Sequence, residues 1–298
     1  MRKKVRVGVL MGGPGSEREV SLNSGRNVLS AFRSKENTQR YIAVPIEIRD
    51  PKKVLAQLAL AKPDVAFSVV HGTFGEDGVL QSLLEIARVP YVGSGVLASA
   101  LAMNKKLSSF LVNTKGVRVP RETKKIPCVV KPNDSGSSVG VTIVKNKKDL
   151  AKAIKLASKE GGPIIQEFVP GTELTCGVLK FEKGKPTALP VTEIVPKSKF
   201  FDYKAKYTKG GSEEITPARI SKKLTQEVQE AALLAHKTLG CRHISRSDFI
   251  LSKDKIYYLE TNTSPGMTNT SLIPQAAAVA GLSMPDLCDR LVRAALLQ

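Results

Sequence analysis

The 298-residue sequence contains no tryptophan, few aromatic residues and only four cysteines, Cys128, Cys176, Cys241 and Cys288. The cysteines lie far apart and form no Cys-x-x-Cys pair, which favours a reduced cytoplasmic protein over a disulfide scaffold or a zinc site. No apolar run approaches the roughly 20 residues that a membrane span needs, so we expect no membrane partner. The basic start of the chain leads into a short β-branched run and then glycines, so we expect a first strand there and not a signal peptide.

Acidic residues are scarce relative to basic ones. The sequence has 46 Lys and Arg against 27 Asp and Glu, a formal charge of +19 that would concentrate anionic partners near the protein. The basic residues are spread along the whole chain, however, and no motif of a nucleic-acid-binding module is present. Runs such as KNKKDLAKAIKLASK place lysines on the polar face of an amphipathic helix. We therefore interpret most of the charge as solvated surface and expect no specific nucleic acid.

The order of the predicted elements indicates an α/β protein. The first third alternates buried-strand and helical patterns, which predicts a parallel sheet with ligands at the carboxyl ends of its strands. Residues 128 to 169 read as strand, loop, strand, helix and strand, and strands dominate again from about residue 173. Residues 196–215 show no period of either kind, which is typical of a lid or binding loop. We predict three lobes, at residues 1–94, 95–180 and 181–298.

Residues 131–140, KPNDSGSSVG, form a glycine-serine loop that differs from the common phosphate loops. The stretch has neither a Gly-Lys-Ser/Thr ending nor the three-glycine dinucleotide spacing, and strand patterns lie on both sides of it. Backbone N–H groups at such a hairpin tip can still surround phosphate oxygens, with Lys131 adding a point charge. A flexible hairpin tip explains the residues equally well.

The N-terminal turn, GGPGSEREV, is a second candidate anion site. Its glycines would let a ligand approach the start of a helix, where free N–H groups favour negative charge. Glu17 lies in that first turn, where an acid also suits the helix dipole, so the local residues alone favour helix capping.

The closing hairpin carries the most specific local pattern. Glu260 and Asn262 are two residues apart and share a face of one strand, as Arg246 and Asp248 do on its partner. Two carboxylates, an amide and an arginine indicate a site for one or two Mg²⁺ ions that hold nucleotide phosphates. An exposed hairpin with an ion pair is the alternative.

The aperiodic segment contains YKAKY, with Tyr203, Lys204, Lys206 and Tyr207. Such residues could close over a charged substrate and exclude water, although a solvated basic loop is an equal alternative. Of the three histidines, only His71 is placed for a site, because it follows a buried strand.

Seven stretches, namely GSEREVSLNSG, HGTFGEDG, MNKK, VVKPNDSGSSVG, YKAKY, SRSDFIL and LETNTSPGMTNTSLIP, together resemble the successive signatures of the D-alanine-D-alanine ligase family. The resemblance runs from about residue 5 to 295 in the correct order. It implies a three-lobed ATP-grasp fold with an N-terminal parallel-sheet domain that binds substrate. It also implies an ATP-dependent ligase that phosphorylates one D-alanine and joins it to a second for peptidoglycan precursors.

The same resemblance implies the nucleotide site. Lys105 and Lys131 would contact the phosphates, Glu167 the adenine edge and Glu173 the ribose. The full set expected around ATP is Lys105, Lys131, Gly136, Ser137, Ser138, Glu167, Phe168, Val169, Glu173 and Lys206. Asp248, Glu260 and Asn262 would bind Mg²⁺, with Mn²⁺ as an alternative metal. A monovalent cation and a homodimer are further expectations from the family. Phe168 departs from members that carry a lysine at this point.

Substrate roles follow from the resemblance in the same way. Glu17 would bind the ammonium of the first D-alanine, so the family context replaces the capping interpretation. His71 would lie near the carboxylate being activated, and Arg246 with the backbone N–H of Gly266 would form the oxyanion site. Ser271 and Leu272 would hold the second carboxylate, and Lys206 would reach charged groups from the lid. Ser137, Tyr207 and Glu17 would link the glycine loop, lid and N-terminal turn.

Two alternatives stay open at this point. One is another ATP-grasp carboxylate-amine ligase with a different acceptor, such as D-serine. The other is a basic anion-binding or nucleic-acid-binding protein whose ligase features are vestigial. Tyr207 argues for an amino-acid acceptor, because family members that make the D-lactate ester have histidine there.

Overall fold

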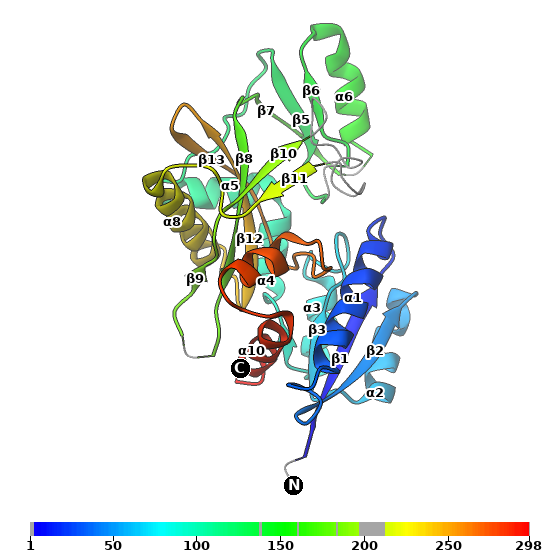
Figure 1. The fold of residues 1–298 in the computed structure, drawn as a ribbon. Coiled ribbons are helices and arrows are strands. Elements are labelled where there is room, and N and C mark those ends of the chain that lie inside the picture. Colours follow the sequence, from blue (N-terminus) through cyan, green and yellow to red (C-terminus); the bar gives the residue numbers. More distant parts are fainter. Residues whose placement is uncertain (1–2, 137–138, 160, 183, 197–211, 298) are drawn as a thin grey trace.

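A computed structural model describes residues 3–136, 139–159, 161–182, 184–196 and 212–297. Its described strands form three sheets, each covered by helices, and the sheets follow one another along the long dimension of the molecule (Figure 1). The boundaries between the predicted lobes stay a prediction. Two of the sheets lie within one expected region each, whereas the third takes residues Thr172–Leu179 from the second region and its other strands from the third.

The N-terminal sheet is parallel, as the alternation of strands and helices predicted. Its spatial order is β2 (Tyr41–Ile48), β1 (Val5–Gly12), β3 (Val65–Ser68) and β4 (Tyr91–Val92). Its helices are α1 (Arg18–Phe32), α2 (Val54–Ala61, after the 3-10 turn η1 at Pro51–Lys53) and α3 (Val79–Ile86). Because side chains alternate along β1, Val9 packs in the core under α1 while Leu10 packs in the core under α2 and α3. Both faces are therefore buried, as a parallel sheet requires.

The smallest sheet contains the glycine loop. Its order is β6 (Thr142–Val144), β5 (Cys128–Pro132) and β7 (Pro163–Glu167), all antiparallel. Helix α6 (Leu150–Ala157), preceded by the 3-10 turn η2 (Lys147–Asp149), packs on β5 through Ala153 and Ala157. The loop at 133–141 joins two antiparallel strands, so the expectation of strands on both sides is confirmed.

The C-terminal sheet carries the predicted hairpin. Its order is β11 (Ser212–Ile215), β10 (Thr192–Pro196), β8 (Thr172–Leu179), β12 (Ile244–Ser252) and β13 (Lys255–Asn262), with β9 (Thr187–Ala188) also paired to β8. Helices α8 (Lys222–Thr238), α4 (Val96–Met103) and α5 (Lys105–Asn113) cover it. Two details differ from the sequence interpretation. The segment without a period ends in the edge strand β11, and α4 was not foreseen because its eight residues show no polar face.

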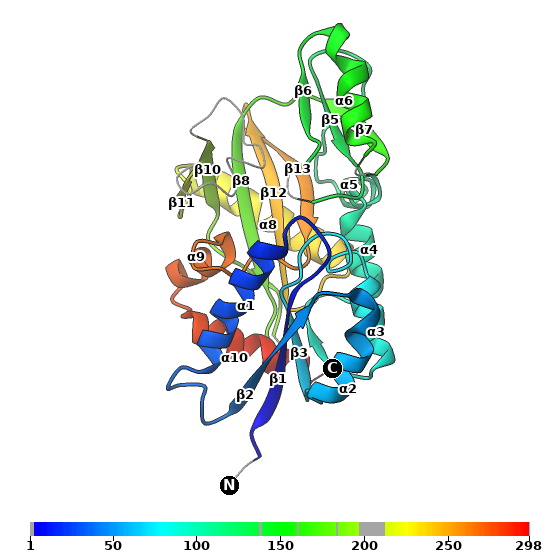
Figure 2. The same cartoon turned by 90° about the vertical axis from the view of Figure 1, so that its right-hand side faces the viewer.

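The last helix returns to the first sheet. After α9 (Leu272–Val279), helix α10 (Met284–Ala295) buries Leu287, Leu291 and Val292 in the same core as Val7 and Phe32 (Figures 1 and 2). At the rim of this core, the buried carboxylate of Asp289 accepts hydrogen bonds from Tyr41 Oη and Arg40 Nη1, each at 2.7 Å. The N-terminal sheet is therefore completed by residues from the far end of the described chain.

Candidate active site

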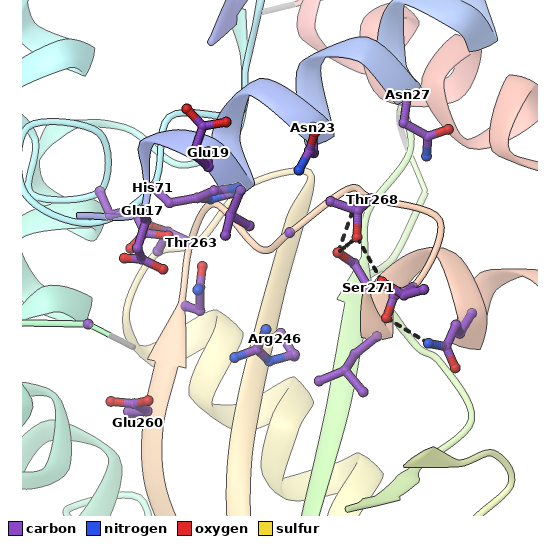
Figure 3. Close-up of a pocket in the computed structure, with 18 of the residues that line it drawn as sticks. Glu17, Glu19, Asn23, Asn27, His71, Arg246, Glu260, Thr263, Thr268 and Ser271 are labelled. Atoms are coloured by element: carbon purple, nitrogen blue, oxygen red, sulfur yellow. Dashed lines mark hydrogen bonds between the residues drawn. The ribbon is translucent and has the colours of Figure 1, made fainter. Parts of the chain in front are cut away.

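A cavity of about 1150 Å³ lies where the three sheets meet. Figure 3 shows side chains from α1, from the loop after β3 and from the ends of β12 and β13 around it. Residues predicted for the site that line it are Glu17, His71, Lys105, Gly136, Arg246, Glu260, Asn262, Gly266, Ser271 and Leu272. The cavity thus gathers groups that lie as many as 255 positions apart in the sequence, from Glu17 to Leu272.

The hairpin of β12 and β13 forms the polar floor of the site. A bulge between Asp248 and Phe249 sets a register that pairs Arg246 with Asn262 and Asp248 with Glu260, so the four side chains share one face. Arg246 Nε and Nη2 donate to Asp248 Oδ1 and Oδ2 at 2.9 and 3.0 Å, a bidentate pair between two buried residues. Thr175 on β8 donates to Asp248 Oδ1 at 2.6 Å. This arrangement fixes the guanidinium at the cavity wall.

Two lysines bring positive charge to the same floor. Lys105, at the start of α5, lies with its Nζ 3.3 Å from Glu260 Oε2 and donates to the carbonyl of Ser135 in the glycine loop. Lys131, on β5, is buried, and this burial lowers its pKa to about 8; Glu260 opposes the shift and Lys105 adds to it. The geometry links the glycine loop to the strand that carries Glu260.

Glu17 lies at the N-terminal end of α1 but does not cap it. Its side chain makes no capping hydrogen bond, so the capping interpretation that the local residues favoured is wrong. The carboxylate instead approaches two loops. A Cβ on Gly72 would lie 2.9 Å from Glu17 Oε2, and one on Gly136 would lie 3.4 Å from it. Glycine at both positions therefore lets the carboxylate lie between the turn after β3 and the glycine loop.

His71 is held in one tautomer by a chain of hydrogen bonds. Its Nδ1 lies 2.9 Å from the carbonyl oxygen of Ser264, which can only accept, so Nδ1 carries the proton. Its Nε2 lies 3.3 Å from Ser24 Oγ, which in turn accepts a hydrogen bond from the N–H of Met267 at 3.1 Å. The ring therefore joins β3, α1 and the loop after β13.

The loop after β13 is compact where Gly266 meets Ser271. A Cβ on Gly266 would lie only 2.7 Å from Ser271 Oγ, closer than real side-chain contacts allow. Ser271 Oγ accepts from the N–H of Thr268 at 3.0 Å and lies 2.7 Å from Thr268 Oγ1 (Figure 3). Ser271 is the N-cap of α9 without a side-chain cap bond, and Leu272 is the first helical residue. A hydroxyl and helix N–H groups therefore lie at one end of the cavity.

The residues expected around the nucleotide lie farther along β5, β7 and β8. Glu167 ends β7, and its Oε1 accepts from the N–H of Arg121 at 3.1 Å. Phe168 and Val169 follow it, and Glu173 lies on β8 opposite Ile250 of β12. None of these four, nor Lys131 or Asp248, lines the cavity described above.

Some predicted residues lie outside the described part of the chain. These are Ser137 and Ser138 in the glycine loop, and Tyr203, Lys204, Lys206 and Tyr207 in the predicted lid. Their roles stay predictions. Within the described residues, no helix is long and apolar enough to cross a membrane, and no three His, Cys, Asp or Glu side chains cluster as a metal site. The four cysteines are buried and free.

Comparison with known proteins matches two family models, the D-ala D-ala ligase N-terminus over residues 49–94 and the D-ala D-ala ligase C-terminus over residues 101–293. The chain belongs to the D-alanine-D-alanine ligase family. A D-alanine-D-alanine ligase of Syntrophobacter fumaroxidans is 45% identical over 99% of this chain and 98% of its own length. One from Halalkalibacterium halodurans is 41% identical over 98% and 99% of the two chains.

Solved structures agree with this assignment. A D-alanine-D-alanine ligase of Bacillus anthracis complexed with ATP is 30% identical, covers 99% of this chain and 98% of its own, and has a TM-score of 0.83. A D-Ala:D-Ser ligase of Enterococcus faecalis is 31% identical, with coverage of 98% and 100% and a TM-score of 0.84. The expected family and its three-lobed ATP-grasp fold are confirmed.

The ligase cavity also contains residues that the sequence interpretation missed. Glu76 is buried and its Oε2 accepts from the N–H of Gly72 at 3.0 Å, which fixes the loop beside Glu17. Asn27, on α1, donates from Nδ2 to the carbonyl of Met267 at 2.7 Å. Glu76 lies inside the HGTFGEDG stretch, one of the seven that carry the family resemblance, so the sequence did mark it as a candidate site residue. Asn27 carried none, because a polar residue on a helix is ordinarily solvated.

Proposed function

We propose that this protein is an ATP-dependent ligase that joins two D-alanines into D-alanyl-D-alanine. One observation carries the proposal. A single cavity combines an acid at a helix start, a histidine held in one tautomer, and an acid, an amide and an arginine from one hairpin. The second acid of the hairpin, Asp248, lies outside the cavity lining and holds the arginine. These groups suit a reaction that must hold an amino acid, transfer a phosphoryl group and stabilise an oxyanion. The family to which the chain belongs supports the same reading.

The first D-alanine would bind at the N-terminal side of the cavity. Glu17 supplies a carboxylate for the substrate ammonium, and Gly72 and Gly136 leave room for that carboxylate. His71, with its proton on Nδ1, presents Nε2 and Ser24 Oγ near the carboxylate to be activated. That carboxylate attacks the γ-phosphorus of ATP, forming an O–P bond as the bond to ADP breaks. The acylphosphate that results is a far better electrophile than a carboxylate.

The second D-alanine would bind at the end of the cavity formed by the loop after β13. Ser271 Oγ and the N–H of Leu272 offer donors for its carboxylate. Its amine attacks the acylphosphate carbonyl, and the tetrahedral oxyanion would be stabilised by Arg246 and the N–H of Gly266. Because Asp248 holds Arg246 through two hydrogen bonds, the guanidinium needs little rearrangement when charge develops. Phosphate then leaves and the peptide bond remains.

Charge on the ATP phosphates would be met by the floor of the site. Lys105 and Lys131 lie near Glu260, and Lys105 also donates to the glycine loop. We assign Gly136, Ser137 and Ser138 to the phosphate cover and Lys206 to the lid. Glu167, Phe168 and Val169 are assigned to the adenine and Glu173 to the ribose from the family resemblance. Glu167 ends β7 of the glycine-loop sheet, and Glu173 lies on β8 of the C-terminal sheet.

Asp248, Glu260 and Asn262 fit a Mg²⁺ site by their donor chemistry. All three present oxygen atoms, which Mg²⁺ prefers, and the hairpin register places them next to one another. The two carboxylates already pair with cations, Asp248 with Arg246 and Glu260 with Lys105. Asn262 Oδ1 accepts from the N–H of Ser264. The metal would neutralise charge on the transferred phosphoryl group. Mn²⁺ has the same ligand preference, and a monovalent cation, a homodimer and a cytoplasmic location are proposed from the family alone.

The decisive test measures phosphate release from Mg²⁺-ATP with D-alanine, L-alanine, D-serine and D-lactate, singly and mixed. We expect turnover with D-alanine alone, and a D-alanyl-D-alanine product by mass spectrometry. Preferential formation of D-alanyl-D-serine would instead support the alternative ligase, which resembles the Enterococcus faecalis enzyme in acceptor. Absence of D-alanine-dependent turnover would refute the proposal.

Two substitutions test the assigned floor of the site. Glu260→Gln and Arg246→Ala should each lower kcat by about 100-fold or more while the circular dichroism spectrum stays unchanged. Lys106→Ala is a matched control, because Lys106 pairs with Glu122 away from the cavity. Near-normal rates in the first two variants would contradict the metal and oxyanion assignments.

A further inference from the structure

A second, much smaller cavity lies behind the active site. It has a volume of about 20 Å³ and is enclosed between the N-terminal sheet, β12 and the loop after β13. Its walls include apolar side chains, among them Phe67, Ile244 and Met267. The residues with polar side chains are Ser68, Gln81, Ser94, Thr263 and Ser264. This volume exceeds the roughly 10–15 Å³ that one water molecule requires.

Two polar atoms of the residues that line this cavity are unsatisfied. Among the described residues, neither Gln81 Oε1 nor Ser264 Oγ has a hydrogen-bond partner, although both atoms are buried. The orientation of the Gln81 amide is fixed, because its Nε2 donates to the carbonyl of Gly75 at 2.8 Å. The unpaired terminal atom of Gln81 is therefore the oxygen Oε1, which can only accept a hydrogen bond. Leaving two such groups unpaired costs the folded protein the lost hydration of each.

Ser264 also connects two active-site residues through its backbone. Its carbonyl oxygen accepts from His71 Nδ1 at 2.9 Å, and its N–H donates to Asn262 Oδ1 at 2.8 Å. The same residue therefore holds the tautomer of the histidine and the orientation of the amide. Its hydroxyl is the one polar group of Ser264 that faces away from these two contacts and has no described partner.

We propose that the small cavity binds one water molecule that bridges Gln81 Oε1 and Ser264 Oγ, and that Ser264 is thereby a positioning residue for His71 and Asn262. The water donates one hydrogen bond to Gln81 Oε1. It forms a second hydrogen bond with the Ser264 hydroxyl, in which either oxygen can be the donor. It joins α3 of the N-terminal lobe to the loop of the C-terminal lobe and prevents Ser264 from shifting. The expected effect on catalysis rests on the proposed function of His71 and Asn262. The water site itself does not depend on that function.

The water is tested by structure and by stability. A crystal structure that resolves ordered solvent should show a peak within hydrogen-bond distance of both atoms. A double-mutant cycle combines Ser264→Ala with Gln81→Met. Gln81→Met also removes the hydrogen bond to Gly75, but it does so in both backgrounds, so this loss cancels in the cycle. We expect Gln81→Met to change the unfolding equilibrium constant about fivefold less in the Ser264→Ala background than in the wild type. The reason is that Ser264→Ala has already removed the water to which Gln81 would bond. Ser82→Ala is the control, because its hydroxyl bonds Gly78 within α3; it should be additive with Gln81→Met.

The positioning role is tested by kinetics. Ser264→Ala should raise the Mg²⁺ concentration for half-maximal rate about tenfold, as loss of a group that orients a metal ligand commonly does, while Ser82→Ala should not. An unchanged Mg²⁺ response would overturn the positioning role. An empty cavity or strict additivity would overturn the water site. If the wild-type enzyme shows no D-alanine-dependent turnover, the proposed function fails, yet the crystal structure and the cycle still decide the water site.

Discussion

The two buried histidines of the C-terminal lobe, His236 and His243, should make the protein lose stability in mild acid. His236 is 1% exposed and its Nδ1 lies 2.8 Å from Ser245 Oγ. His243 is 6% exposed and its Nδ1 accepts from the N–H of Gly93 at 3.1 Å, a contact between lobes that protonation of Nδ1 would break. Burial, with a further contribution from nearby cations that include Lys180, lowers the pKa of each to about 4.

The size of the effect follows from proton linkage. The unfolded chain binds a proton at each histidine below pH 6.5, whereas the folded protein does not until about pH 4. The two histidines therefore do not lower the free energy of unfolding above pH 6.5. They lower it progressively as the pH falls from 6.5 to about 4, because only the unfolded chain binds the protons in that range. At pH 5 the loss is about 2 kcal/mol per histidine, or about 4 kcal/mol for both, relative to pH 8.

The measurement is urea unfolding at intervals between pH 8 and pH 5, for wild type and for a variant with His236→Asn and His243→Asn. Asparagine cannot titrate here, its oxygen can accept the Gly93 N–H, and it tolerates the positive φ of 54° at position 243. The variant should be the less stable at pH 8 but lose less stability on acidification. Parallel pH profiles for the two proteins would refute the reasoning, because carboxylate contributions are common to both.

Three further outcomes are expected. Gly266→Ala should lower kcat/KM for D-alanine by about 10- to 100-fold with little change in melting temperature, because the new Cβ displaces Ser271; a normal rate would contradict this. Asp289→Asn should lower the free energy of unfolding by about 1–3 kcal/mol in chemical denaturation, since it weakens the charge-assisted bond to Tyr41; unchanged stability would oppose it. Asn27→Ala should raise the KM for D-alanine severalfold, because α1 then loses its bond to the loop after β13; an unaltered KM would count against that contact.

The closing hairpin was predictable because its determinants are local. The two-residue period of a strand places Arg246 with Asp248 and Glu260 with Asn262, whatever the rest of the fold does. The turn sets the register only at its own end, where Lys253 and Asp254 have positive φ, of 47° and 58°, as a two-residue hairpin loop demands. A bulge between Asp248 and Phe249 then shifts the pairing by one residue, which brings Asp248 opposite Glu260. The strand period was therefore sufficient to place each pair on one face, whereas the bulge that brings the two pairs together was not predicted.

Contacts between distant segments were not predictable in the same way. The amphipathic pattern of α10 shows that one face is buried but not that it packs on the N-terminal sheet. The bond between His71 and Ser264 joins residues 193 positions apart and depends on two loops with no regular period. Strand β11 is formed by Ser212–Ile215, whose two glutamates disfavour a strand until β10 supplies its pairing edge. In each case the deciding partner lies outside the local sequence.

The return of α10 to the first sheet has a mechanical consequence. The N-terminal lobe is joined to the rest of the described chain at two places, between β4 and α4 and between α9 and α10. Helix α10 cannot separate from the N-terminal sheet without exposing Leu287, Leu291 and Val292 to water, which costs about 1.5–3 kcal/mol for each side chain. A movement of the N-terminal sheet relative to β12 and β13 therefore carries α10 with it, and both connecting segments must bend together.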